Sequence, residues 1–207
     1  MKYNIPRVTQ IDETSCASAN YTMVGEALGL SENLSDILKI TKSELGFIPF
    51  WRWLVKEKKA QITDFSLNNL KDWADYNFDK FVSQTDPRVV KFFTDRIKDT
   101  KSYQEDLKFL FQSGKFEFNH IRPTVNLLKE YFSKDYACDV MLDPWLIYGV
   151  EPEWYSLHRV TIVDVTGDEI VFHDPASDGE EFFKSTSENF EKAFQIEGAE
   201  LTCYKIV

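Results

Sequence analysis

The sequence predicts an α+β protein, with a helix-rich first half and a strand-rich second half. Between residues 34 and 133, apolar residues recur at helical spacing with charged residues between them. From Tyr136 onward, short runs rich in β-branched residues follow one another instead. No linker-like segment separates the halves, so we expect residues 1–207 to form one domain with two lobes. Within it we distinguish residues 1–33, a helical lobe at 34–135 and a β lobe at 136–207.

The composition favours a folded protein that acts away from nucleic acids and membranes. The 207 residues are 43% hydrophobic and include 17 Phe, 9 Tyr and 5 Trp, which supplies a sizeable core and excludes global disorder. The formal net charge of −10 argues against a surface that binds nucleic acid or an anionic membrane. No apolar stretch is long enough to cross a bilayer, and no signal peptide is visible at the N-terminus. We therefore expect a soluble cytoplasmic protein.

The first predicted helix begins at a cysteine. The segment Asn4–Gln10 has extended character, and Asp12 to Ser15 offer N-cap candidates for a helix over Cys16–Leu28 that Gly29 would end. Ala17, Tyr21, Val24 and Leu28 recur every three or four residues, so we expect one apolar face on this helix.

The middle of the chain predicts further helices, at Arg88–Ile97, Tyr103–Phe111 and Thr124–Phe132. The aromatic run Phe47–Trp53 could line a cleft, but core packing is the interpretation we favour. The later part predicts one short helix, Ser187–Phe194, and four strands: Cys138–Leu142, His158–Val165, Glu169–His173 and Leu201–Val207.

One of the three cysteines is a candidate nucleophile. Their odd number and the lack of a CxxC pair argue against a zinc cage or a disulfide framework. Cys138 and Cys203 lie in strand-like runs, where a small buried hydrophobe is the expected role. Cys16 alone starts a strong helix, where the helix dipole stabilises a thiolate.

A general base and its orienting group are expected on neighbouring strands. His158 and Asp174 can face each other only if the hairpin between them has an odd loop or contains a bulge. A three-residue loop, Val165–Gly167, would achieve this pairing, and His173 would then point to the opposite face. We assign His173 and His120 to structural roles and expect no metal site.

Acyl transfer also needs hydrogen-bond donors for the developing oxyanion. The side-chain amide of Gln10, six residues before Cys16, could supply one, and the Cys16 backbone N–H could supply the other. Each residue alone has an ordinary structural explanation. The ordered set Gln10, Cys16, His158 and Asp174 favours catalysis.

This ordered set resembles the papain-like cysteine peptidases, most closely the bacteriocin-processing (double-glycine leader) peptidases and their stand-alone relatives. The similar stretches are Ile5–Gln10, Thr14–Ala19, His158–Val165 with Ile170–Pro175, and Ser187–Phe194. The resemblance implies a papain-like two-lobe fold, with the nucleophile at a helix N-terminus in the first lobe and an antiparallel sheet in the second. It also implies a reduced thiol, no metal or cofactor, and hydrolysis of a peptide or protein substrate by Cys16, His158 and Asp174.

Two alternatives share this fold. A phytochelatin-synthase-like transferase would pass the same thioester to an amine, and a non-catalytic module would bind a peptide or partner protein. The acidic stretch Asp178-Gly179-Glu180-Glu181 is most simply a solvated surface, with a preference for basic peptide substrates as the alternative. The sequence does not indicate the oligomeric state.

Overall fold

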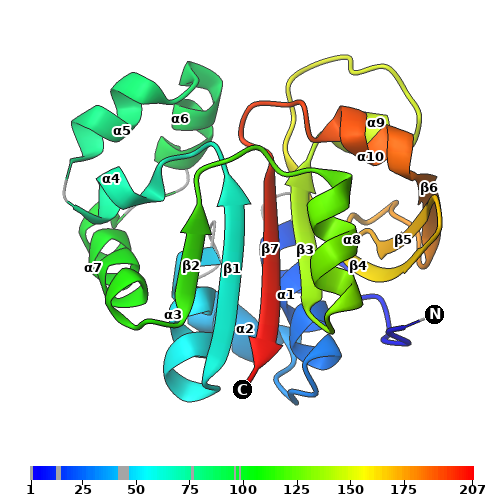
Figure 1. The fold of residues 1–207 in the computed structure, drawn as a ribbon, viewed down its shortest axis with the longest axis horizontal. Helices are drawn as coiled ribbons and strands as arrows, with labels where there is room; N and C mark the ends of the chain where they lie inside the picture. Colours follow the sequence, from blue (N-terminus) through cyan, green and yellow to red (C-terminus); the bar gives the residue numbers. More distant parts are fainter. Residues whose placement is uncertain (1, 13–14, 42–46, 76, 96, 98) are drawn as a thin grey trace.

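The computed structural model describes residues 2–12, 15–41, 47–75, 77–95, 97 and 99–207. These residues form the predicted α+β fold, built on one mixed seven-stranded sheet of order β2-β1-β7-β3-β4-β5-β6 (Figure 1). β1 and β2 are parallel, and every other neighbouring pair is antiparallel. The strands are β1 (Ala60–Ser66), β2 (Phe116–Asn119), β3 (Ala137–Leu142), β4 (His158–Thr166), β5 (Glu169–His173), β6 (Phe183–Thr186) and β7 (Glu200–Ile206).

Helices cover both faces of this sheet. Figure 1 shows α1, α2 and α3 behind the sheet and α8 in front of it, while α4 to α7 gather beside the β2 edge. The helices are α1 (Cys16–Ala27), α2 (Leu34–Thr41), α3 (Phe47–Glu57), α4 (Leu70–Ala74), α5 (Phe78–Gln84), α6 (Pro87–Thr94), α7 (Thr100–Gln112), α8 (Val125–Ser133), α9 (Pro144–Ile147) and α10 (Ser187–Ala193). The predicted helices and strands are therefore confirmed, with small shifts at their ends. Arg96, within one predicted helix, lies outside the described residues.

The sheet extends further than the sequence indicated. Residues 34–135, expected to be a helical lobe, also contribute β1 and β2, and β6 was not expected either. β2 and β6 have only four residues each, too short for a recognisable alternation. β1 could not be recognised from alternating apolar and polar residues, because polar Thr63 and Asp64 are both buried there. As a result, the sheet runs through both halves of the chain.

The aromatic run in α3 belongs to the core, as the sequence favoured. Phe47, Phe50 and Trp51 are at most 2% exposed and pack in one apolar cluster with Tyr21 of α1. The rings of Tyr21 and Phe50 are stacked, with centroids 4.3 Å apart. This packing holds α1 firmly behind the sheet.

The prediction of a single apolar face on α1 was wrong, because the helix is buried on all sides. Every residue from Ala17 to Gly25 is buried, including Ser18, Asn20 and Thr22. Their polar groups find partners: the Thr22 hydroxyl donates to the Ser18 carbonyl at 3.0 Å, for example. The helix ends near Gly29 as predicted, where Gly29 has φ +75° and the Leu30 N–H bonds to the Gly25 carbonyl at 2.9 Å. Cys16 thus begins a central helix.

The β4–β5 hairpin brings His158 and Asp174 to the same face by a bulge. Thr166 pairs with Glu169, so the turn contains two residues and the suggested three-residue loop is wrong. The register then shifts between Ile162 and Asp164, which restores the facing that an odd loop would have given.

Candidate active site

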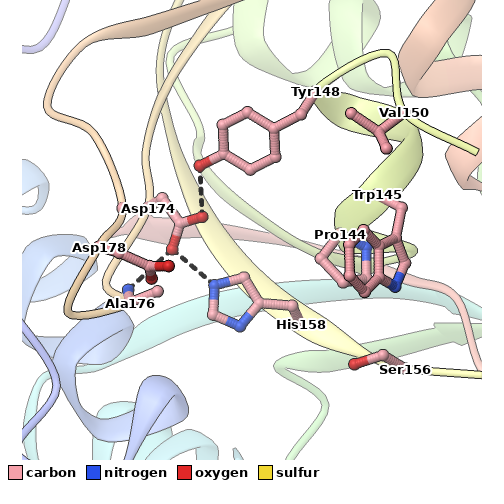
Figure 2. A pocket seen from close by; sticks show the side chains of 10 residues that line it. Pro144, Trp145, Tyr148, Val150, Ser156, His158, Asp174, Ala176 and Asp178 are labelled. Carbon is pink, nitrogen blue, oxygen red and sulfur yellow. Dashed lines mark hydrogen bonds and ion pairs between the residues drawn. The ribbon is translucent and has the colours of Figure 1, made fainter. Parts of the chain in front are cut away.

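A hydrogen-bonded pair of His158 and Asp174 forms the centre of the site. His158 is the first residue of β4, and its Nε2 lies 2.7 Å from Asp174 Oδ1 (Figure 2). The Tyr148 hydroxyl donates to Asp174 Oδ2 at 2.6 Å, and the Ala176 backbone N–H donates to Oδ1 at 2.8 Å. Both carboxylate oxygens are therefore fixed, which sets the orientation of the imidazole.

The loop after β5 folds back closely over Asp174. The Asp174 N–H bonds to the Glu180 carbonyl at 3.2 Å, and the Gly179 N–H bonds to the Ala176 carbonyl at 2.9 Å. A Cβ atom at Gly179 would lie 2.8 Å from Asp174 Cγ, closer than side chains tolerate. Glycine is needed at this position because the loop backbone approaches the carboxylate so closely.

The N-terminal segment, residues 3–10, runs alongside this hairpin and loop. The Tyr3 N–H bonds to the Val163 carbonyl at 3.0 Å, within the bulge. The Arg7 guanidinium donates to the carbonyls of Asp174, at 2.6 Å, and Ala176. The Gln10 N–H bonds to the Pro175 carbonyl at 2.7 Å. These contacts bring the segment before Cys16 next to the loop that carries Asp174.

Gln10 therefore lies beside the Asp174–Pro175 step, and its role as an oxyanion donor stays a prediction. Its side-chain Oε1 is buried and accepts no hydrogen bond from the residues that the structure describes. Ser15 does not cap α1 as expected. Its hydroxyl instead accepts from the backbone N–H groups of Ile11, at 2.9 Å, and Asp12, at 3.1 Å. Of the other three cap candidates, Glu13 and Thr14 lie outside the described residues.

The electrostatics favour charge separation between thiol and imidazole. Burial opposes the Cys16 thiolate, but a hydrogen bond and charge from His158, with a smaller contribution from Arg159, lower the pKa of Cys16 below its ordinary value. Burial also opposes the imidazolium, but hydrogen bonds to Asp174 and Cys16 raise the pKa of His158 to about 10. With Nε2 bonded to Asp174, Nδ1 is the ring nitrogen that remains for the thiol.

The pKa of Asp174 is lowered, which favours a charged carboxylate beside the His158 imidazolium. Burial opposes its ionisation, yet hydrogen bonds and charge from His158, together with the Tyr148 hydroxyl, lower its pKa below the ordinary value. Cys16 itself is partly exposed. The arrangement can therefore hold a thiolate, an imidazolium and a carboxylate together.

A buried ionic network lies directly behind this site, and the sequence analysis missed it. Arg159, one residue after His158, pairs with Asp139 at 2.8 Å and with Glu200. Asn20 of α1 donates to Asp139 at 2.6 Å and accepts from the Thr161 hydroxyl at 2.6 Å. These side chains are at most 3% exposed. Asn20, one helical turn after Cys16, was the available signal in the sequence.

The remaining cysteines and histidines have structural surroundings. Cys138 and Cys203 are buried, face each other across β3 and β7, and have sulfur atoms 3.6 Å apart. The rings of His173 and His120 contact backbone carbonyls, of Ile5 at 2.9 Å and Leu67 at 2.8 Å respectively. Across the described part of the chain, no group of three or more His, Cys, Asp or Glu side chains could hold a metal ion.

A cavity of about 420 Å³ opens beside the imidazole. Figure 2 shows Pro144, Trp145, Tyr148 and Val150 on one side of His158, and Asp174, Ala176 and Asp178 on the other. A molecule held in this cavity would contact His158 and Asp174, since both residues line it.

Comparison with known proteins gave no assignment: no protein-family model matches the chain, and no curated protein matches it. None of the helices in the described residues is long and apolar enough to cross a membrane.

Proposed function

We propose that the protein is a cysteine peptidase of the papain-like kind, in which Cys16 attacks an amide carbonyl. The observation that carries this proposal is the linked set Cys16, His158 and Asp174, with a lowered pKa on the thiol and a raised one on the imidazole. The papain-like two-lobe arrangement is part of the same proposal. It is supported by α1 packing against β3 and β4, with its first residue in contact with the first residue of β4.

The chemistry follows from the charge state of the pair. The Cys16 thiolate adds to the carbonyl carbon, and the Cys16 N–H and the Gln10 amide stabilise the oxyanion. The intermediate collapses, the C–N bond breaks, and the His158 imidazolium gives its proton to the leaving amine. The neutral imidazole then takes a proton from water, which attacks the thioester and releases the acid and the thiolate. A reduced thiol of this kind suits the cytoplasm.

The test is site-specific labelling as a function of pH. Iodoacetamide should modify Cys16 well below the pH at which an ordinary thiol reacts, because its pKa is lowered. The His158→Ala variant should shift that midpoint upward, towards the ordinary value for a thiol, whereas His120→Ala should not. Peptide mapping identifies the modified cysteine.

Two results would contradict the proposal. One is labelling of Cys16 with the midpoint of an ordinary thiol. The other is unchanged cleavage of a peptide substrate by the Cys16→Ala variant. Where hydrolysis occurs, it should decline as the pH rises through about 10, because His158 then loses the proton that the leaving amine requires.

A further inference from the structure

The cavity beside His158 lies on the leaving-group side of the proposed reaction. In acyl transfer by a thiol, the acyl half stays on sulfur, while the amine half receives its proton from the imidazole. His158 and Asp174 line the cavity, and Cys16 does not. An occupant of the cavity is therefore next to the proton donor, which is the position of the departing amine half.

One wall of the cavity is apolar. Pro144, Trp145, Tyr148 and Val150 come from α9 and the turn after it (Figure 2). The Trp145 ring is held edge-on against Trp154, with centroids 4.8 Å apart. A wall of this kind accommodates the aliphatic stem of a long side chain, and its aromatic faces also attract a cationic head.

The opposite wall carries one carboxylate, that of Asp178, which is not part of the proposed catalytic set Cys16, His158 and Asp174. Asp174 is engaged by His158, Tyr148 and Ala176. Asp178 is exposed and forms no ion pair with any residue that the structure describes, and no Lys or Arg lines the cavity within that part of the chain. The uncompensated charge of the cavity is therefore negative.

We infer that this cavity is a subsite for a basic side chain on the leaving half of the substrate. A Lys or Arg stem would lie along Trp145 and Val150, and its charged head would face Asp178. The inference rests on the proposed function, which determines that the leaving half of the substrate lies in this cavity. It also gives a specific role to the acidic stretch that starts at Asp178.

The experiment measures binding of product-like amines without catalysis. The probes are arginine amide, norleucine amide and glutamic acid α-amide, which share the free amine that cleavage would release and differ in side-chain charge. They are titrated into the full chain carrying Cys16→Ala, which cannot form a thioester. Binding is followed at the Trp145 indole NMR signal, assigned by its loss in Trp145→Phe.

Arginine amide should bind about two- to fivefold more tightly than norleucine amide, the range expected for one exposed ion pair. Glutamic acid α-amide should bind most weakly. Asp178→Asn should abolish the arginine preference and leave norleucine amide unaffected. Asp168→Asn, which removes an exposed carboxylate from the β4–β5 turn, is the matched control and should preserve the preference.

The inference is overturned if arginine amide binds no better than norleucine amide, or if Asp178→Asn and Asp168→Asn change its binding equally. Because these titrations need no turnover, their result is independent of whether Cys16 proves reactive. A reactive Cys16 without an arginine preference would remove only the subsite. An arginine preference with an unreactive Cys16 would remove only the peptidase.

Discussion

His158 and Arg159, two adjacent residues of β4, form ion pairs in very different surroundings. His158 pairs with Asp174 at the wall of a cavity, and its side chain remains 14% exposed. Arg159 pairs with Asp139 and Glu200 within the interior, where all three side chains are at most 3% exposed. Of these two pairs, only the first can exchange a proton with a molecule in the cavity, because the second is closed off from it.

The pKa shifts of the carboxyl groups differ in sign between these two places. Asp174 meets one cation and additional donors, and its pKa is lowered. Burial raises the pKa of Asp139 to about 6. Burial and the nearby charge of Glu200 raise the pKa of Asp64 well above its usual range. A single cation outweighs desolvation for one carboxylate, but not where several buried carboxylates share it. The His158–Asp174 pair is thus suited to proton transfer, whereas the buried pairs of Arg159 are suited to a structural role.

Breaking the interior pairs should have the largest effect. We expect Arg159→Met to lower the free energy of unfolding by about 3–5 kcal/mol, since it leaves Asp139 and Glu200 buried without their cation. Urea unfolding measures this loss. Arg88→Met removes an exposed ion pair with Asp86 and should barely change the midpoint. Equal effects of the two substitutions would show that the network contributes little.

Crowding the loop over Asp174 should have an intermediate effect, confined to the site. Gly179→Ala places a Cβ 2.8 Å from Asp174 atoms, so we expect Asp174 to shift away from His158. The rate of Cys16 alkylation near neutral pH should fall about tenfold or more, because a displaced Asp174 no longer stabilises the His158 imidazolium that favours the thiolate. Gly25→Ala meets only Leu30 Cβ, at 3.9 Å, and serves as the control that keeps the rate. An unchanged rate in Gly179→Ala would mean that the carboxylate is not held by this loop.

Removing one hydrogen bond from Asp174 should have the smallest effect. Tyr148→Phe deletes the donor to Oδ2, which helps to keep the pKa of Asp174 low, so that pKa should rise. The loss of Cys16 reactivity on acidification should then begin at a higher pH, with a change of about three- to tenfold in rate on the acid side. A pH profile of alkylation measures this shift. The Tyr155 hydroxyl donates to the Glu197 carbonyl, away from Asp174, so Tyr155→Phe should leave the pH profile of alkylation unchanged.

The helices and longer strands could be predicted because their patterns are local. β5 falls at the predicted residues, and α8 and α10 differ only at their ends. The closeness of His158 and Asp174 could also be anticipated, since strand alternation limits which residues face each other. The bulge that achieves it could not be predicted, because an odd loop satisfies the same condition.

The buried polar residues are the part that the sequence conceals. Asn20, Asp64 and Arg159 have polar or charged side chains of the kinds that usually lie at the surface, yet all three are buried. Their burial becomes possible only because residues from α1, β1, β3, β4 and β7 meet and satisfy one another. Tyr148 was missed for the same reason, as its partner Asp174 lies 26 residues away.

The central position of β7 has a consequence for synthesis on the ribosome. Residues 200–206 form the last strand in the sequence, yet they lie between β1 and β3 in the sheet. Until they emerge, β1 and β3 each lack a neighbour, and Arg159 lacks Glu200. A nascent chain that already contains Cys16, His158 and Asp174 would thus still lack their shared scaffold, so we expect these three residues to be held in place only after residues 200–206 have been made and paired.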